Sequence, residues 1–190
     1  MWLSDHWRSV LLTFILTLVV SFILNAGSNS ALAKVGLWPS LLILIAIIGV
    51  GVLFDLVGTA VAAASETPLH AMAGNKIPGA KQAIWLVRNA DRVASFCNDL
   101  VGDISGTLAG AAAATIAFNI SSTSTWLKVF LAAITAALTV SLKRAEKSLA
   151  INKATEIIYS TGRLLYYLEN VTGMSLTPNK KSVKKKLRSE

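Results

Sequence analysis

The sequence predicts an all-α integral membrane protein with about four transmembrane helices. Charged residues make up 15% of the chain, against roughly 25% in soluble domains. The mean hydropathy of the chain is +0.59. The apolar residues also form continuous runs, and a helix that spans a bilayer needs about 20 such residues in a row.

Two of the apolar runs come early in the chain. The first covers residues 10–24 and precedes Ala31-Leu32-Ala33. We expect this run to be an uncleaved anchor, although the same pattern fits a secretory signal peptide, residues 1–33, that is removed by cleavage. The second run covers residues 40–54 and continues through small residues to about residue 64.

The other two apolar runs lie in the second half of the chain. The third extends from about residue 97 to residue 118, and the fourth covers residues 127–142. Lys143 follows the fourth run directly. We expect a further helix over residues 145–168 to lie along the membrane surface as a juxtamembrane helix, because it mixes apolar and charged residues.

A basic stretch, residues 69–96, separates the second run from the third. Its positive residues are Lys76, Lys81, Arg88 and Arg92. The Pro78-Gly79 pair divides the stretch, and both residue types interrupt helices. We therefore expect a cytoplasmic belt of two short interfacial helices.

Positive charge predicts the topology. The belt, the segment after the fourth run and the tail are basic, whereas the other two loops contain only Lys34. We expect a multi-pass plasma-membrane protein with both termini in the cytoplasm. Its predicted parts are an N-terminal anchor with an outer loop (1–36), a transmembrane domain with the juxtamembrane helix (37–173) and a basic cytoplasmic tail (174–190).

The basic tail predicts a lipid partner. The net charge of the chain is +8, and most of the excess comes from the tail. Each Lys or Arg near an anionic lipid surface contributes about 1 kcal/mol of attraction. Because no aromatic residues accompany these charges, we expect no binding to nucleic acid.

No catalytic constellation is recognisable in the sequence. Cys97 is the single cysteine, and His6 and His70 are isolated from each other. The sequence has neither zinc-ligand spacing nor a hydrolase triad, so we expect that the protein is not an enzyme. Paired aspartates leave intramembrane proteolysis as an alternative, although the motifs of that class are missing.

Ionisable residues within apolar runs indicate functional sites. Asp55, Thr59 and Glu66 have spacings of four and seven, which would place them on one stripe of the second helix. Pro68 would leave the carbonyl of Ala64 without its usual helical donor. Carboxylate and carbonyl oxygens together favour a hard cation.

A second polar cluster opens the third run and consists of Asn98, Asp99, Gly102 and Asp103. Gly102, Gly106 and Gly110 form a small-residue ridge, which allows two helices to pack closely. Packing this ridge on the second helix would bring the two clusters face to face. Carboxylates at one depth repel each other, and a divalent cation offsets the repulsion. Oxygen donors without thiolate or imidazole favour Mg²⁺.

Less specific interpretations stay open for the same residues. The aspartates of the second cluster can be solvated groups at the cytoplasmic interface. Glu66 can pair with Lys76 or Arg92 of the belt. Asn98 can cap the third helix, since asparagine is a favoured N-cap residue.

Three segments occur in an order that resembles a known family. They are residues 62–69 (AAASETPL), 98–103 (NDLVGD) and 147–154 (KSLAINKA). The first is similar to a small-residue stretch ending in Ser-Glu-Thr, the second to an Asn-Asn-Leu-Val-Asn motif and the third to a Pro-Lys-Ser-Leu-Ala motif. All three are typical of the transmembrane domain of the cyclin-M (CNNM) and CorB/CorC magnesium transporters. The resemblance covers roughly residues 40–173.

The resemblance implies a binding site for a dehydrated magnesium ion and a homodimer. Carried over to this sequence, it nominates Ser65, Glu66, Asn98 and Gly102, with Asp99 beside them. Asp55, Thr59 and Asp103 are not part of the family motifs and come from the pattern of this sequence alone.

The sequence also departs from the family. Lys143 occupies a position where the family has a glutamate, and Glu146 occupies that of a proline. The cytosolic CBS domains of the family have no counterpart in these residues, so nucleotide regulation cannot be inferred.

The leading hypothesis is transport of a divalent cation, with magnesium as the expected ion, through a site between the second and third helices. The alternative is a non-transporting membrane scaffold or an accessory subunit with the same fold, acting in a larger membrane complex. The absent CBS domains and Lys143 motivate this alternative.

Overall fold

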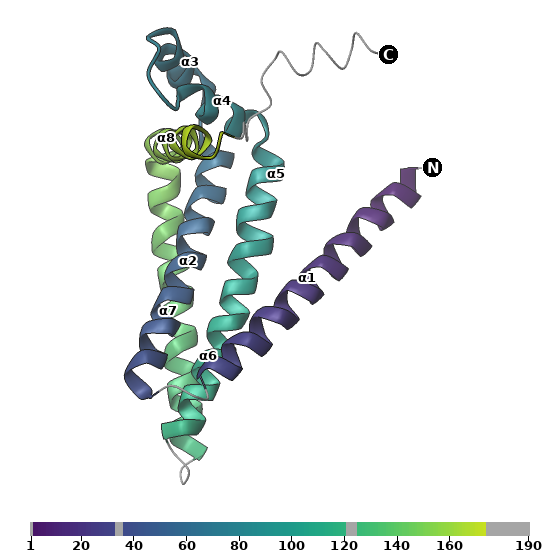
Figure 1. Cartoon of the computed structure of the whole chain (residues 1–190), viewed down its shortest axis with the longest axis vertical. Coiled ribbons are helices and arrows are strands. Elements are labelled where there is room, and N and C mark those ends of the chain that lie inside the picture. The colour runs from purple at the N-terminus through teal and green to yellow at the C-terminus, as the bar shows by residue number, and fades with distance from the viewer. Residues whose placement is uncertain (1, 33–35, 121–124, 174–190) are drawn as a thin grey trace. The chain divides into compact units, whose positions relative to one another are not determined.

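The computed structural model describes residues 2–32, 36–120 and 125–173. All regular secondary structure among these residues is helical (Figure 1). The basic tail, residues 174–190, lies outside the described residues, as do residues 33–35 and 121–124 of the loops.

Four helical stretches of the described chain are long and apolar enough to cross a membrane, as predicted. They lie in α1 (Trp2–Leu32), α2 (Leu37–Ala63), the stretch Ala90–Phe118 and α7 (Thr125–Asn152). Many of their large apolar side chains are exposed. Apolar surface of this extent is unusual for a soluble monomer and indicates a membrane protein.

The third of these stretches is not a regular α-helix. It consists of α5 (Ala90–Ala94), the π-helix η1 (Ser95–Gly102) and α6 (Asp103–Ile120). The predicted start near residue 97 is therefore wrong, and Asn98 lies inside the helical stretch instead of capping it. π-Helical turns are rare and are often found at functional sites.

Contacts divide the chain into two units, which are described separately. Unit 1 consists of residues 1–55 and 96–146, and unit 2 of residues 56–95 and 147–190. In unit 1, α1 contacts α6.

In unit 1, the first part of α2 packs against α6 in an antiparallel direction. Near one end, Leu44 contacts a cluster of buried residues on α6, which are Ala109, Ala112, Ala113 and Ile116. Further along, Gly51 faces Ser105. Small residues at these positions let the two backbones approach closely.

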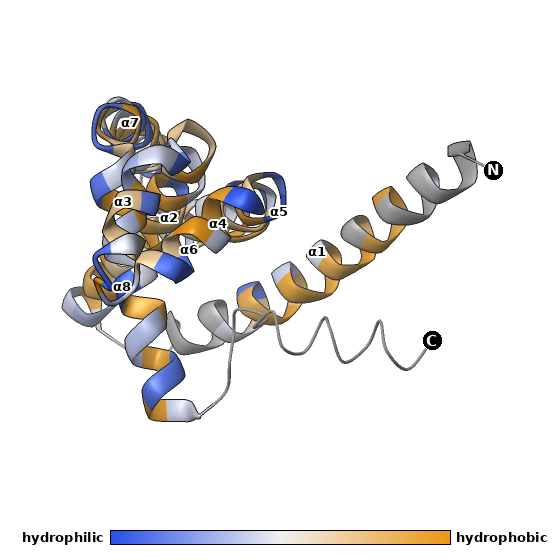
Figure 2. Ribbon diagram, turned by 90° about the horizontal axis from the view of Figure 1, so that it is seen from above, coloured by the Kyte–Doolittle hydropathy of each residue, from blue (hydrophilic) through white to orange (hydrophobic). Residues whose placement is uncertain are grey.

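In unit 2, α3 (Glu66–Gly74) and α4 (Ala80–Arg88) correspond to the two short helices that the sequence of residues 69–96 predicts. They pack against each other, and α4 packs against α8 (Ala154–Thr172). Leu69, Leu86 and Ile158 are buried between them. The ribbon of α8 mixes hydrophilic and hydrophobic residues (Figure 2), which is typical of a helix with one buried face.

The second helix ends at Ala63, so Glu66 does not belong to it. Residue 66 begins α3, with Ser65 as its N-cap, and the hydroxyl of Ser65 accepts a hydrogen bond from the amide of Thr67 at 3.4 Å. Pro68 then lies in the first turn of α3, where its missing N–H leaves no helical bond unmade. The expectation that Asp55, Thr59 and Glu66 share one helical stripe is therefore wrong.

The predicted helix over residues 145–168 is also divided. Residues 145–152 continue α7, and α8 begins at Ala154. Lys153 lies between them with φ −117° and ψ 26°, outside the α-helical region. The last apolar run therefore extends into a charged segment without a break.

Two glycines allow α8 to approach the start of α4. A Cβ atom on Gly162 would lie 2.6 Å from both the amide nitrogen of Ala83 and the carbonyl oxygen of Gly79. Gly79 itself has φ +87°, a left-handed conformation that favours glycine. The contact between α4 and α8 therefore depends on these two positions.

We predict that Gly162→Ala destabilises the protein. The new methyl group meets backbone atoms, and overpacking of this kind costs about 1–3 kcal/mol of unfolding free energy. Helix propensity alone would favour alanine by roughly 1 kcal/mol, so a net loss identifies the close contact. Gly74→Ala is the matched control, because a Cβ at Gly74 meets nothing within 4 Å. Unfolding in detergent micelles measures both variants, and equal stability of the two would contradict the prediction.

Candidate functional site

Asp55 is a buried carboxylate within an apolar helix. Its exposed fraction is 7%. It precedes the last residue of α2 by eight positions, which corresponds to about 12 Å along the helix axis. Burial of an unpaired charge is costly, so a carboxylate at this place requires a partner.

The partner of Asp55 is Lys143 on α7. The ammonium nitrogen of Lys143 lies 2.8 Å from Oδ2 of Asp55. It also donates a hydrogen bond to the carbonyl oxygen of Gly102 at 3.4 Å and lies 3.8 Å from Oδ1 of Asp103. Oxygens from two segments of unit 1, α2 and the junction of η1 with α6, therefore surround one ammonium group.

Gly102 provides the space for the Asp55 carboxylate. A Cβ atom at this position would overlap Oδ1 of Asp55 and lie 2.8 Å from its Cγ. Any side chain at residue 102 would therefore displace the carboxylate from Lys143. Of the small-residue ridge predicted from the sequence, Gly102 makes this close contact, whereas a Cβ at Gly106 or Gly110 would meet nothing within 4 Å. One turn after Gly102, it is Ser105 that faces Gly51.

The two carboxylates of this group differ in exposure. The side chain of Asp103 is 73% exposed, whereas that of Asp55 is 11% exposed. Asp55 therefore dominates the attraction for Lys143, since the charge in the less polar surroundings interacts more strongly. One negative charge remains in the group, because two carboxylates face one ammonium.

The other predicted residues of the second cluster lie on η1. Oδ1 of Asn98 is buried and has no hydrogen-bond partner among the described residues. Asp99 is exposed. Buried acceptors in native proteins nearly always bind a donor, an ordered water or an ion, so Asn98 is the residue of η1 that most requires a ligand.

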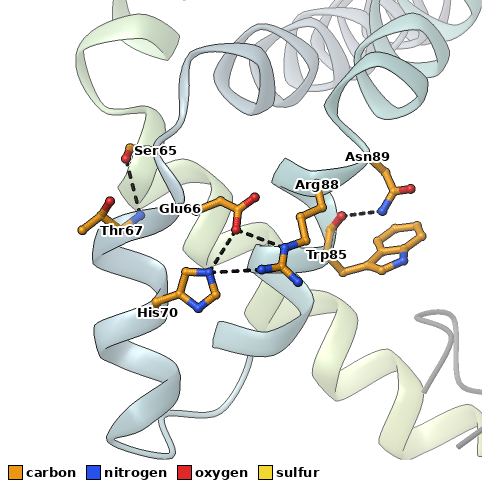
Figure 3. Close-up of polar contacts among 7 residues, drawn as sticks. All are labelled: Ser65, Glu66, Thr67, His70, Trp85, Arg88 and Asn89. Atoms are coloured by element: carbon orange, nitrogen blue, oxygen red, sulfur yellow. Dashed lines mark hydrogen bonds and ion pairs between the residues drawn. The ribbon is translucent and has the colours of Figure 1, made fainter. Parts of the chain in front are cut away.

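Glu66 belongs to a separate cluster in unit 2 (Figure 3). Its Oε2 accepts a hydrogen bond from Nε of Arg88 at 3.0 Å and lies 2.9 Å from Nε2 of His70. The predicted partners in the belt, Lys76 and Arg92, are therefore the wrong residues. Hydrogen bonds from His70 and Arg88 hold the pKa of Glu66 below its ordinary value.

The structure thus distributes the predicted site residues between two groups. In unit 1 it brings together Asp55, Gly102 and Asp103. In unit 2, Glu66 meets basic side chains and Ser65 caps α3. Thr59 lies one turn after Asp55 on α2. In the part of the chain that the structure describes, no three His, Cys, Asp or Glu side chains gather closely enough to hold a metal ion by themselves.

Sequence reasoning missed the basic partners of both groups. The sequence marks Lys143 as a departure from the family pattern but does not identify it as the ion-pair partner of Asp55, and it gives no partner role to Arg88 or His70. One signal was present for Lys143, because a lysine directly after an apolar run of a spanning helix needs a counter-charge or a route to water. Nothing in the local sequence singles out Arg88 among the belt cations.

No family model, curated protein or solved structure matches this chain. The resemblance to the cyclin-M and CorB/CorC transporters therefore stays an expectation of the sequence motifs, and the function is argued from the geometry of the two groups.

We predict that Gly102→Ala destabilises the protein and loosens the ion pair. The methyl group would displace the short Asp55 side chain, at a cost of about 1–3 kcal/mol of unfolding free energy. Gly106→Ala is the control, because a Cβ at Gly106 meets nothing within 4 Å. Thermal unfolding in detergent compares them. A Gly102 variant as stable as the Gly106 variant would contradict the observed packing.

We predict that Arg88→Gln raises the pKa of Glu66. Because its pKa is lowered, the Glu66 carboxylate stabilises the folded state at pH values above its ordinary pKa of 4.5. This stabilisation is lost as the pH falls through the lowered pKa. A carbon-13 titration of the Glu66 carboxyl in micelles measures the midpoint. Arg92→Gln removes the same charge from the belt and is the control. A midpoint that is identical in the wild type and Arg88→Gln would show that the contact does not persist in solution.

Proposed function

We propose that this protein transports a divalent cation, with magnesium as the cargo, across the plasma membrane. In this proposal all four apolar stretches cross the bilayer. The basic belt, residues 69–96, lies on the cytoplasmic side with both termini, following the excess of positive charge. The resemblance of the sequence motifs to magnesium transporters supports the same function and a homodimeric assembly.

One observation carries the proposal. Oxygens of Asp55, Asp103 and the Gly102 carbonyl converge on a single cationic group, the ammonium of Lys143. Asp55 is the single charged residue of α2, while Gly102 and Asp103 lie in the stretch Ala90–Phe118. Because ionisable residues within spanning helices are costly, they are usually retained for substrate or ion pathways.

The chemistry of these oxygens fits a hard cation. Carboxylates and a main-chain carbonyl are ligands that Mg²⁺ accepts, usually with several waters retained. Asn98, four residues before Gly102 on η1, has a buried amide oxygen that lacks a hydrogen-bond partner among the described residues. Soft metals would require thiolate or imidazole ligands, and Cys97 is the sole cysteine of the chain.

A second function, that of a non-transporting scaffold, is favoured by a specific observation. The carboxylates of Asp55 and Glu66 are each in contact with a basic side chain of the protein itself. A protein that had lost transport could keep these carboxylates as structural ion pairs. The scaffold function and the transport function differ in whether a cation crosses the membrane at all.

Reconstitution into proteoliposomes that enclose a magnesium-sensitive dye tests the proposal. We expect an inward magnesium gradient to produce a faster signal with the wild type than with protein-free liposomes. Asp55→Asn should abolish this difference, because it removes the charge that dominates the group while keeping the shape of the side chain. Asp91→Asn, which removes an exposed aspartate of the belt, should leave the flux unchanged.

Each outcome has a definite meaning. Wild-type flux at the level of protein-free liposomes would exclude transport and favour the scaffold. Equal flux in the wild type and Asp55→Asn, above that of protein-free liposomes, would support the proposal of transport but exclude Asp55 from the cation pathway.

A further inference from the structure

The ammonium of Lys143 lies among oxygen atoms of three residues. It contacts a carboxylate oxygen of Asp55 at 2.8 Å and a main-chain oxygen of Gly102 at 3.4 Å, and Asp103 lies 3.8 Å away. These are the oxygen types that bind magnesium. An ammonium group and a metal ion cannot occupy this space together.

We propose that Lys143 is an internal cation that competes with the cargo for the oxygens of Asp55, Gly102 and Asp103. The inference rests on the proposed function for the identity of the cargo and adds a regulatory element to the site. A divalent cation binds only when the Lys143 side chain withdraws. When the cation leaves, the ammonium returns and neutralises Asp55 again.

The structure provides for such a withdrawal. The side chain of Lys143 is 32% exposed, three times the exposed fraction of the Asp55 side chain. A lysine has a flexible stem of four carbons and a single charged head, so the ammonium can move away without a change in α7. The Asp55 side chain is short, and its carboxylate packs against Gly102, so it has little room to move.

Charge predicts the order of affinities among variants. The group of Asp55, Asp103 and Lys143 carries one net negative charge. Lys143→Gln would raise this to two negative charges, which matches a divalent cation. Asp55→Asn would reduce it to zero, and the combination of both substitutions would return it to one. Divalent affinity should therefore be highest in Lys143→Gln and lowest in Asp55→Asn.

The first experiment uses the unaltered chain. A small amine-acylating reagent labels the protein in lipid nanodiscs, and mass spectrometry measures the modified fraction of Lys143 with and without MgCl₂ at constant ionic strength. We expect magnesium to increase the labelling of Lys143, because the displaced amine is no longer held by Asp55. Lys147, an exposed residue one turn later on α7, is the internal control and should not respond.

The second experiment measures Mg²⁺ binding to the purified variants by calorimetry. Lys143→Gln should bind about tenfold more tightly than the wild type, and the double variant Asp55→Asn/Lys143→Gln should lose this gain. Lys147→Gln removes a lysine outside the group and should bind like the wild type. If Lys143→Gln fails to fold because Asp55 is left uncompensated, the labelling experiment still decides.

The outcomes separate this inference from the proposed function. Wild-type transport combined with unchanged binding in Lys143→Gln, or with labelling of Lys143 that magnesium does not increase, would overturn the inference alone. If Lys143→Gln binds magnesium more tightly than the wild type while the wild type shows no flux, the inference is supported and transport is overturned. Absence of binding in both proteins would overturn both.

Discussion

The ion pair between Asp55 and Lys143 is the constraint on which unit 1 depends. A carboxylate and an ammonium placed within apolar helices are each costly, and together they are acceptable only at short distance. The pair fixes which faces of α2 and α7 meet. It also explains why residue 102 has no side chain, since any Cβ there would occupy the position of the carboxylate. The Asp55–Lys143 pair thus determines both the charge balance of unit 1 and the need for glycine at residue 102.

The sequence predicted the four long apolar stretches and the two short helices between the second and the third, because both depend on local composition. Continuous apolar runs identify helices long enough to cross a membrane, and the Pro78-Gly79 pair separates α3 from α4. Where helices end was harder to predict. Ser65 has extended backbone angles (φ −93°, ψ 141°) and caps α3, so the helix of α2 does not continue into α3. Lys153 separates α7 from α8 without a proline or glycine. Such ends depend on a few backbone angles and not on hydropathy.

The candidate site was predictable in part for a similar reason. The glycine ridge and Asp55 indicated that α2 and the third stretch pack together, and Asp55, Gly102 and Asp103 do meet. The cations of both groups were not assigned, because pairing between α2 and α7, or between α3 and α4, depends on how distant segments pack. The π-helical geometry of η1 could not be predicted either, since no sequence pattern distinguishes a π-helical turn from an α-helical one in an apolar run.

The two functions considered for the protein differ in whether the oxygens around Lys143 stay bound to its ammonium or exchange it for a cation. A permanent ion pair would make the protein a structural component, and an exchangeable one would make it a carrier. The most direct measurement is the dipolar coupling between the Lys143 Nζ and Asp55 Cγ nuclei in lipid bilayers, by solid-state NMR with nitrogen-15 and carbon-13 labels. We expect strong coupling without magnesium and its loss when magnesium is added. No coupling in either condition would contradict the ion pair, and strong coupling in saturating magnesium would contradict the exchange.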